Sequence, residues 1–295
     1  MKNTVFTGAA TALVTPLTEE GVDYRAFADL IEWQIAEGID ALVIAGTTGE
    51  GSTLTDEEHR QVLKFAAEQV RGRVPVIAGT GSNDTAYAID LTKYACEAGC
   101  DAMLLVTPYY NKATQRGLVA SFRAIADAST KPCILYNIPG RTGCNLLTPA
   151  LSELADHDRI VGVKEASGNI SQIAEEAALC GDRLDIYSGN DDQIVPILSL
   201  GGAGVISVLS NLLPRETSRM CHMFLEGDVK GPREMQLSYL PLISALFSEV
   251  NPIPVKAAMA RMGFGKNCLR LPLTPMEEAH EAVLVAEMRK AGIRV

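Results

Sequence analysis

The run Ile160-Val161-Gly162-Val163-Lys164 has the composition of a strand that enters a hydrophobic interior and ends on a cation. Its residues are apolar up to the lysine, as expected for a parallel strand covered on both faces. A buried ammonium group loses its hydration, so burial lowers its pKa. A neutral lysine amine is a nucleophile that condenses with carbonyl compounds. Taken alone, however, the stretch favours a simpler interpretation, a lysine at a strand end that leans out to solvent.

Seven further apolar, β-branched runs resemble this one and recur along most of the chain. They cover residues 11–17, 41–46, 74–79, 102–107, 133–138, 184–187 and 204–208. The first six runs of the series begin about 25–33 residues apart, the span of one strand and one crossover helix. Eight such units close naturally into a (β/α)8 TIM barrel. The sequence therefore predicts an α/β protein built on this barrel.

The segments between the runs have helical periodicity and recognisable ends. Residues 27, 30, 31 and 35 are apolar at helical spacing, and Gly38 follows to end that helix. Thr55 and Glu58 have the spacing of a capping box. Thr148 before a proline predicts another helix start. Each strand is therefore expected to be followed by a crossover helix.

The repeat fails after Gly227, and the remaining pattern is helical. We expect residues 1–227 to form the barrel and residues 228–295 an all-helical C-terminal domain. The alternative is an open doubly wound sheet, which more often carries a glycine fingerprint after its first strand. The closest match, Gly79-Thr80-Gly81-Ser82-Asn83-Asp84, lacks the third glycine.

The composition of the chain indicates which partners it binds and in which compartment it resides. The chain of 295 residues is 47% hydrophobic and 21% charged, with a formal net charge of -10. Nucleic acids and anionic membranes normally require a basic face, so neither is expected as a partner. The seven cysteines contain no CxxC pair, which favours a reducing cytoplasm. The four histidines are isolated and form no metal-binding motif, so no metal is expected.

The second run continues into Gly46-Thr47-Thr48-Gly49-Glu50. Two hydroxyls and successive backbone N–H groups between glycines can cradle a carboxylate. The alternative is a tight turn in which a threonine caps the next helix.

Aromatic and cationic side chains follow the next strand ends. Tyr109 and Tyr110 come after the fourth run, and Tyr136 lies in the fifth. A tyrosine at a strand end can relay a proton, although most tyrosines are packing residues with a bonded hydroxyl. Arg141, on a loop between two glycines, suits bidentate binding of a substrate carboxylate, unless it is simply an exposed loop residue.

In a (β/α)8 barrel these strand ends meet at one mouth, where the reacting groups of such enzymes lie. Lys164 would then share the mouth with the tyrosines, the threonines and Arg141. Gly189 follows the seventh run, and Ile206 lies in the eighth. This inventory, without a cofactor fingerprint, suits carbonyl chemistry through a Schiff base, in which phenols move protons. The neighbouring strand ends thus reverse the first interpretation of Lys164.

Three motifs carry a resemblance that extends over essentially the whole chain. They are Gly46-Thr47-Thr48-Gly49-Glu50, Tyr136-Asn137-Ile138-Pro139-Gly140-Arg141-Thr142-Gly143 and Val161-Gly162-Val163-Lys164-Glu165-Ala166-Ser167-Gly168. Together they resemble the dihydrodipicolinate synthase family, in the superfamily of pyruvate-dependent class I aldolases typified by N-acetylneuraminate lyase. Tyr109-Tyr110-Asn111 and Arg141 resemble the synthase branch specifically.

The resemblance implies a cytoplasmic lyase that joins pyruvate to aspartate-4-semialdehyde in lysine and diaminopimelate biosynthesis. Lys164 would form a Schiff base with pyruvate, without any other cofactor. Thr47 and Thr48 would hold the pyruvate carboxylate. Tyr136, Thr47 and Tyr110 would form a proton relay, with Tyr110 reaching in from a neighbouring subunit.

The resemblance also implies the remaining site residues and the assembly. Arg141 would bind the carboxylate of aspartate-4-semialdehyde, while Gly189 and Ile206 would complete the pyruvate pocket. Members of the family are typically homotetramers, built as a dimer of dimers. A tight dimer would complete each active site.

Relatives that lysine inhibits bind it at the tight-dimer interface, and this chain matches that site only in part. His59, Asn83 and Tyr109 match, but Asp56 stands where a histidine is common. Tyr87 replaces the acidic residue that usually holds the ammonium group of the effector. Loss of that charge-assisted contact predicts weak or absent inhibition by lysine.

Two other functions remain as alternatives. A related aldolase could act on another aldehyde or sugar acid, but Arg141 and the Tyr109-Tyr110 pair disfavour it. A non-catalytic effector-binding barrel is disfavoured because Lys164, Tyr136 and the other relay residues are all retained.

Overall fold

Eight parallel strands pair edge to edge and close into a barrel in the computed structural model, which describes residues 4–295. They are β1 (Gly8–Ala12), β4 (Ala41–Ile44), β5 (Val76–Gly79), β6 (Ala102–Val106), β7 (Cys133–Asn137), β8 (Ile160–Glu165), β9 (Asp185–Ser188) and β10 (Gly204–Ser207). Each strand pairs with the next in chain order, and β1 closes the ring by pairing with both β4 and β10. The predicted (β/α)8 barrel is confirmed.

The first strand begins three residues earlier than the pattern predicted. β1 starts at Gly8, whereas residues 11–17 were expected, because its first residues are small and lack the β-branched signal. Glycine is needed at position 8, where φ is 104° and a Cβ would lie 2.2 Å from a carboxylate oxygen of Asp40. Residues from Leu17 onward form a separate hairpin of β2 (Leu17–Thr18) and β3 (Gly21–Val22).

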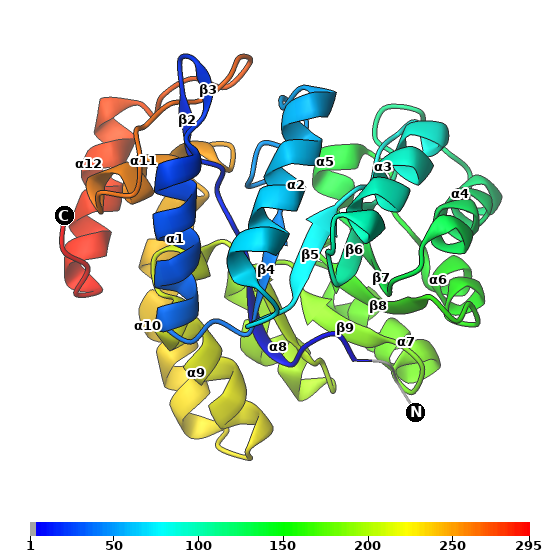
Figure 1. The fold of residues 1–295 in the computed structure, drawn as a ribbon. Helices are drawn as coiled ribbons and strands as arrows, with labels where there is room; N and C mark the ends of the chain where they lie inside the picture. Colours follow the sequence, from blue (N-terminus) through cyan, green and yellow to red (C-terminus); the bar gives the residue numbers. More distant parts are fainter. Residues whose placement is uncertain (1–3) are drawn as a thin grey trace.

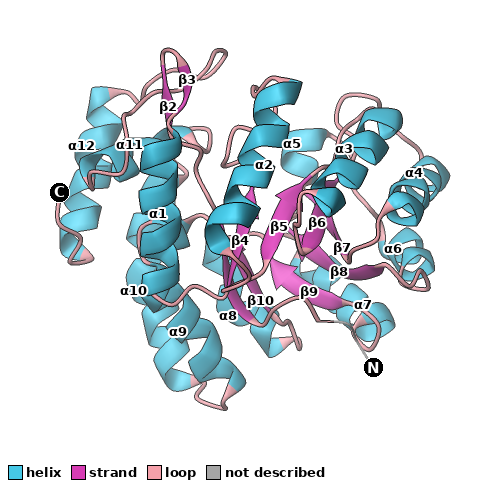
Figure 2. Cartoon of the chain, viewed as in Figure 1, coloured by secondary structure: helices cyan, strands magenta, loops and turns pink. Residues whose placement is uncertain are grey.

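Helices follow every strand of the barrel and surround it (Figure 2). They are α1 (Tyr24–Ala36), α2 (Asp56–Val70), α3 (Thr85–Glu97), α4 (Gln115–Ala128), α5 (Pro139–Thr142), α6 (Thr148–Leu154), α7 (Ile170–Cys180), α8 (Ile194–Ser199) and α9 (Pro214–Leu225), with 3-10 turns η1 (Asp191–Gln193) and η2 (Leu209–Asn211). The capping box of Thr55 and Glu58 is present at the start of α2. Thr148 is not a cap, because it is already the first residue of α6 and Leu147 takes the cap position.

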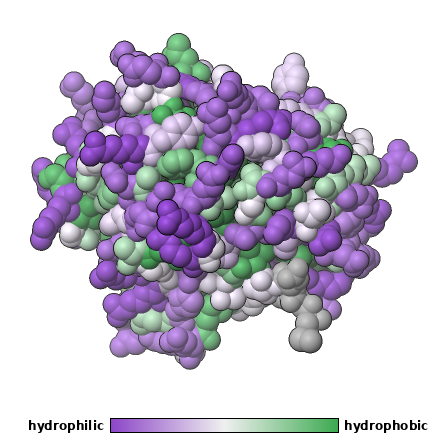
Figure 3. Space-filling model, in the orientation of Figure 1, coloured by the Kyte–Doolittle hydropathy of each residue, from purple (hydrophilic) through white to green (hydrophobic). Residues whose placement is uncertain are grey.

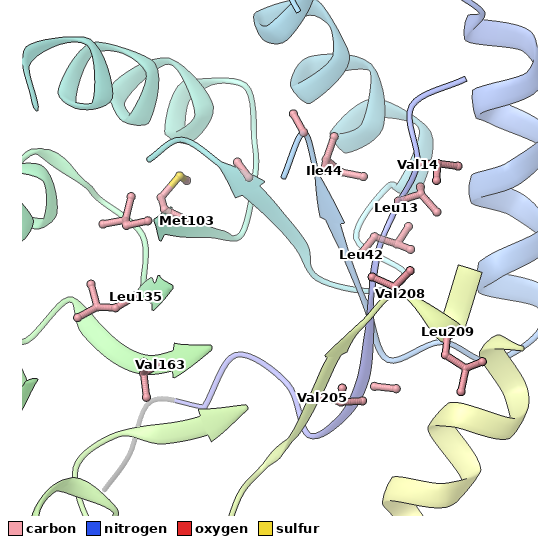
Figure 4. Close-up of a cluster of buried hydrophobic side chains, with 14 of the residues drawn as sticks. Leu13, Val14, Leu42, Ile44, Met103, Leu135, Val163, Val205, Val208 and Leu209 are labelled. Atoms are coloured by element: carbon pink, nitrogen blue, oxygen red, sulfur yellow. The ribbon is translucent and has the colours of Figure 1, made fainter. Parts of the chain in front are cut away.

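Buried side chains form two layers separated by the strands. On β6, Met103 and Leu105 belong to the outer cluster between strands and helices, and Leu104 belongs to the cluster inside the barrel. Figure 4 shows part of the outer cluster, including Met103, Leu135 and Val163 on three successive strands. This alternation decides which residues of each strand can reach the interior and the mouth.

The amino-terminal end of the barrel interior is filled by aromatic packing. The rings of Phe6 and Tyr187 stack with centroids 4.4 Å apart. The Tyr187 hydroxyl donates a 2.8 Å hydrogen bond to the carbonyl oxygen of Phe6. The interior is therefore a packed core below the level of the strand ends.

Three more helices complete the chain: α10 (Lys230–Leu246), α11 (Ile253–Arg261) and α12 (Glu278–Lys290). α10 packs against α9 and α12, so these helices lie together on the side of the barrel near α1 (Figure 1). The face in Figure 3 is largely hydrophilic, with small hydrophobic areas between polar side chains. Among residues 4–295, no helix is both long and apolar enough to cross a membrane.

Candidate active site

Lys164 and Tyr136 lie side by side at the carboxyl ends of β8 and β7. The two residues are register partners, and each is only 5% exposed. The Lys164 amine lies over the phenol ring of Tyr136, 4.3 Å from its centroid. The barrel thus holds an amine and a phenol together in an interior with little access to water.

A bulge in β8 explains why Lys164 points inward. Val161 belongs to the interior cluster and Val163 to the outer one, so the alternation changes phase across Gly162. The pairing register with β7 shifts at the same place. Because a bulge re-aims the residues that follow it, Lys164 faces the interior, while strict alternation from Val161 would turn it away.

Burial sets the protonation of both groups. It lowers the pKa of Lys164 to about 7; the negative charge of Asp191 opposes this change, and the positive charge of Arg141 adds to it. Burial also raises the pKa of Tyr136 to about 12, against the charge of Arg141 and a hydrogen bond with Thr47. Near neutral pH the site therefore offers a substantial fraction of free amine beside a protonated phenol.

The loop between β4 and α2 presents Thr47 and Thr48 to the same mouth. Its tight path requires glycine at position 51, where a Cβ would lie 2.1 Å from the carbonyl oxygen of Ala45. Glu50 anchors the loop, because its buried carboxylate pairs with Lys256 of α11. This buried pair fixes the backbone that carries the two threonines.

Asn251, which precedes α11, connects two of the predicted substrate-binding residues. Its side-chain amide donates a 3.0 Å hydrogen bond to the Thr48 hydroxyl. Its carbonyl oxygen accepts a 3.0 Å hydrogen bond from the exposed guanidinium of Arg141. Its side-chain oxygen is buried and has no hydrogen-bond partner among the described residues. Asn251 thus holds Thr48 and Arg141 in a fixed relation.

Gly189 directly follows β9, the strand next to that of Lys164, and Ile206 lies on β10, one strand further around the barrel. The Gly189 backbone N–H donates a 2.8 Å hydrogen bond to the carbonyl oxygen of Glu165. A Cβ at Gly189 would lie 3.1 Å from Cε of Lys164, so a side chain there would crowd the amine. Ile206 is fully buried in the interior cluster that also contains Tyr136.

A cavity of about 420 Å³ opens at the mouth and extends toward α2 and α3. Thr47, Tyr136 and Arg141 line it on one side, and His59, Tyr87 and Tyr109 belong to the same lining. The cavity therefore joins Thr47, Tyr136 and Arg141 to most of the candidate effector site, while Lys164 is not in its lining and contacts the Tyr136 ring.

The candidate effector residues have partners within the chain. His59 is buried, its Nε2 lies 2.9 Å from the carbonyl oxygen of Gly79, and burial lowers its pKa. Burial and a hydrogen bond with Asp56 raise the pKa of Tyr87 to about 12. Asn83 donates a 3.1 Å hydrogen bond to Asn111 and is not among the residues that line the cavity.

Tyr110 occupies a different position from the other predicted site residues. It is 89% exposed on the loop after β6, and its φ of 72° is unusual for a residue other than glycine. Its side chain is not part of the cavity lining in the described single chain.

The sequence patterns missed several residues that support the site. Asn251, Lys256 and Asp191 were not singled out, although a lysine within the apolar run Val255-Lys256-Ala257-Ala258 was a usable signal. Within residues 4–295, no cluster of three or more His, Cys, Asp or Glu side chains is placed to hold a metal ion.

Comparisons with known proteins agree with this geometry. The model of the dihydrodipicolinate synthetase family matches residues 5–291. A 4-hydroxy-tetrahydrodipicolinate synthase from Lachnoclostridium phytofermentans is 57% identical over 291 residues, covering 98% of this chain and 99% of the relative.

Solved structures of similar proteins agree as well. The dihydrodipicolinate synthase from Aquifex aeolicus superposes with a TM-score of 0.97 at 42% identity, covering 98% of this chain and 99% of the other. A chloride-inhibited dihydrodipicolinate synthase from Acinetobacter baumannii, solved with pyruvate, gives a TM-score of 0.96 at 42% identity, covering 98% and 100% of the two chains.

Proposed function

The chain belongs to the dihydrodipicolinate synthetase family, and we propose that it condenses pyruvate with L-aspartate-4-semialdehyde to give 4-hydroxy-tetrahydrodipicolinate. The reaction is that of a lyase of the class I aldolase type and serves lysine and diaminopimelate biosynthesis. The observation that carries this proposal is the buried Lys164 amine, held against Tyr136 with its pKa lowered to about 7.

In the proposed mechanism, the neutral amine of Lys164 attacks the ketone carbon of pyruvate. The resulting carbinolamine loses water and becomes a cationic imine on the lysine. The imine draws electrons from the methyl group, which loses a proton and becomes the nucleophilic carbon of an enamine. This carbon attacks the aldehyde of the second substrate, whose oxygen takes up a proton. The amino group of that substrate then attacks the imine carbon and closes the ring, and the C–N bond to Lys164 breaks, which releases the free amine and the cyclic product.

We assign the proton movements to Tyr136, Thr47 and Tyr110. The hydrogen bond between Tyr136 and Thr47 supports the first step of this relay. A buried phenol that remains protonated near neutral pH can donate a proton to a departing hydroxyl or a forming alkoxide.

The two substrate carboxylates are assigned to different donors. Thr47 and Thr48, with their backbone N–H groups, would hold that of pyruvate, and the exposed guanidinium of Arg141 would hold that of the aldehyde. Gly189 and Ile206 would shape the floor of the pyruvate site, because one leaves space beside Lys164 and the other fills the interior.

A borohydride experiment tests the imine. Reduction in the presence of pyruvate, followed by peptide mapping, should place a pyruvyl adduct on Lys164. The rate of trapping should rise with pH through about 7, because only the neutral amine attacks. Folded protein without an adduct would overturn the Schiff-base mechanism, and an adduct without turnover of aspartate-4-semialdehyde would overturn the choice of second substrate.

We further propose a homotetramer, a dimer of dimers, in which Tyr110 completes the site of a neighbouring subunit. The 89% exposure of this tyrosine in the single chain supports the proposal. Mixing inactive Lys164→Ala and Tyr110→Ala variants tests it, since a mixed dimer would contain one site with both residues. Recovery of activity is expected, and a mixture that stays inactive while exchanging subunits would contradict a shared site.

We also propose that lysine inhibits this enzyme weakly or not at all. Of the candidate effector residues His59, Asn83, Tyr87 and Tyr109, Tyr87 is the one that departs from the inhibited relatives, and its hydroxyl is engaged by Asp56. Half-inhibition below millimolar lysine would contradict this proposal.

Residues 228–295 are proposed to be a helical domain that also serves the catalytic site. The contacts of Asn251 and Lys256 with the mouth support this role. The proposed location is the cytoplasm, where the seven unpaired cysteines would stay reduced.

A further inference from the structure

Asp191, in the turn after β9, is a buried acid that the mechanism above does not use. It is 2% exposed and receives hydrogen bonds from the Ser207 hydroxyl and from two backbone N–H groups, those of Val208 at 3.0 Å and Leu209 at 2.9 Å. Three donors directed at one carboxylate favour its ionised form, although it lies in the core.

These hydrogen bonds tie the end of β9, the strand that pairs with β8, to the end of β10, the next strand of the barrel. Asp191 follows β9 and Gly189, whereas Ser207 ends β10 directly after Ile206. Gln236 of α10 secures the same turn by donating a 2.8 Å hydrogen bond to the carbonyl oxygen of Asp191. The carboxylate therefore fixes the turn that follows Gly189, the residue beside the amine, and ties it to the strand end that follows Ile206.

The charge of Asp191 also acts on the reacting amine. Of the charged groups that influence Lys164, Asp191 favours the cation and Arg141 opposes it. The adjacent Glu165 is directed to the other side of β8, where it accepts hydrogen bonds from Asn137 and from the backbone of Ser167. The imine formed during the reaction is a cation enclosed by the barrel and requires a negative partner.

We propose that Asp191 is a positioning residue for this reaction, which holds the end of β9 beside Lys164 by tying it to β10 and supplies the negative charge that balances the cationic imine. This role rests on the proposed Schiff-base function. Burial raises the pKa of Asp191, and the contacts from Ser207, Leu209 and Val208, together with the charge of Lys164, oppose that change. Burial, with a smaller contribution from the charge of Asp191, raises the pKa of the Cys221 thiol of α9 and keeps it protonated.

Two variants separate the charge from the contact. Asp191→Asn removes the charge and keeps the shape, whereas Ser207→Ala removes one hydrogen bond and keeps the charge. The rate of borohydride trapping with pyruvate is measured over a range of pH, and its rise on the acid side reports the pKa of Lys164. In Asp191→Asn this acid limb should move to lower pH by roughly one unit, the usual scale for the loss of one neighbouring charge. It should stay in place in Ser207→Ala.

Asp191→Asn should also require several-fold more pyruvate for half-maximal trapping, because its imine lacks a counter-ion. An unshifted acid limb in Asp191→Asn, or an equal shift in both variants, would overturn the proposal. Absence of the adduct in the wild-type protein would instead overturn the proposed function, so the two failures can be told apart.

A measurement on the wild-type protein covers the case in which Asp191→Asn does not fold. Infrared difference spectra with and without pyruvate, on protein labelled with ¹³C-aspartate, report the protonation of buried aspartates. We expect no protonated aspartic acid in the imine state. A C=O band of a buried neutral aspartic acid in that state would contradict the proposed counter-charge.

Discussion

The inner face of β7 and β8 carries a pair of reactive polar residues, whereas the outer face carries a pair that is hydrogen-bonded within the protein. Tyr136 and Lys164 face the interior and contact each other through a ring face and an amine. Asn137 and Glu165, the next residues along the same strands, face outward and are bonded to each other at 2.9 Å. Both pairs are buried, so burial alone does not distinguish a reactive group from a structural one.

The outer pair belongs to a dense network. Asn137 also donates to Asn145 at 2.8 Å, and Gln172 of α7 donates to Glu176 at 2.9 Å. Glu176 in turn is coupled to Glu165 by a side-chain hydrogen bond. Both oxygens of Glu165 thus accept hydrogen bonds from protein donors, whereas the inner amine retains a lone pair for substrate. The hydrogen bonds of Glu165 fix the strands, and the amine, which is free to bond to substrate, carries out the chemistry.

The largest contrast is expected between Lys164→Ala and Glu165→Gln. Lys164→Ala removes the nucleophile, so the pyruvyl adduct should be lost and turnover should fall by roughly 10³-fold or more. Glu165→Gln should keep the adduct and alter mainly stability. Intact mass after reduction, turnover and thermal melting check both variants. A Glu165→Gln protein that folds but forms no adduct would contradict the assignment of a catalytic role to the inner face and a structural role to the outer face.

Tyr136→Phe tests the second residue of the inner face. Loss of the hydroxyl removes the proton donor but leaves the ring under Lys164, so turnover should fall by about 10²–10⁴-fold. Pyruvate trapping should be slowed and still occur at Lys164. Turnover close to wild type would show that the inner phenol is only a packing group.

Asn251→Ala tests how far the C-terminal segment supports the inner face. Losing the hydrogen bond to Thr48 should raise the KM for pyruvate about 5–10-fold, as expected for one neutral hydrogen bond. The backbone contact with Arg141 should persist, so the KM for the aldehyde should change less. Asn267→Ala is the matched control, because Asn267 lies in this segment and also has a buried side-chain oxygen without a hydrogen-bond partner among residues 4–295.

The smallest effect is expected on the outer face, in the pH dependence of stability. Burial and the charge of Glu165 raise the pKa of Glu176 from 4.5 to about 8. The folded state then keeps a proton that the unfolded state has lost, so stability should fall as pH rises through this window. Glu176→Gln should reduce that fall by roughly 1 kcal/mol or more between pH 5 and 8.

Urea unfolding at the two pH values measures the change at Glu176. The neighbouring Glu175→Gln is the control, because Glu175 is exposed on the same helix. If both variants lost the same amount of stability between the two pH values, the proton assigned to Glu176 in the folded state would be contradicted.

Sequence patterns could reveal the barrel because seven of its strands are continuous apolar runs at regular spacing. They could not reveal where β1 begins, since Gly8, Ala9 and Ala10 carry no β-branched signal. They also could not reveal the bulge between Ile160 and Gly162, which depends on the register with β7. Lys164 was identified from its neighbours at the mouth, and its inward direction comes from that bulge.

Local sequence patterns could not predict the residues of the C-terminal segment that support the site, for another reason. Asn251 and Lys256 act on Thr48 and Glu50, residues about 200 positions earlier, through contacts that exist only in the folded chain. Periodicity describes one element at a time and predicts an apolar face for α11. It does not indicate which polar residue of that face meets a strand end.

The stacked pair of Phe6 and Tyr187 has a consequence for the order of events in turnover. Because packed side chains close the far end of the barrel, pyruvate, the aldehyde, water and product must share the mouth. An aldehyde that arrives before pyruvate would obstruct the path to Lys164. Excess aldehyde should therefore inhibit the enzyme competitively with pyruvate. A barrel with a single opening thus imposes an order of binding on its two substrates.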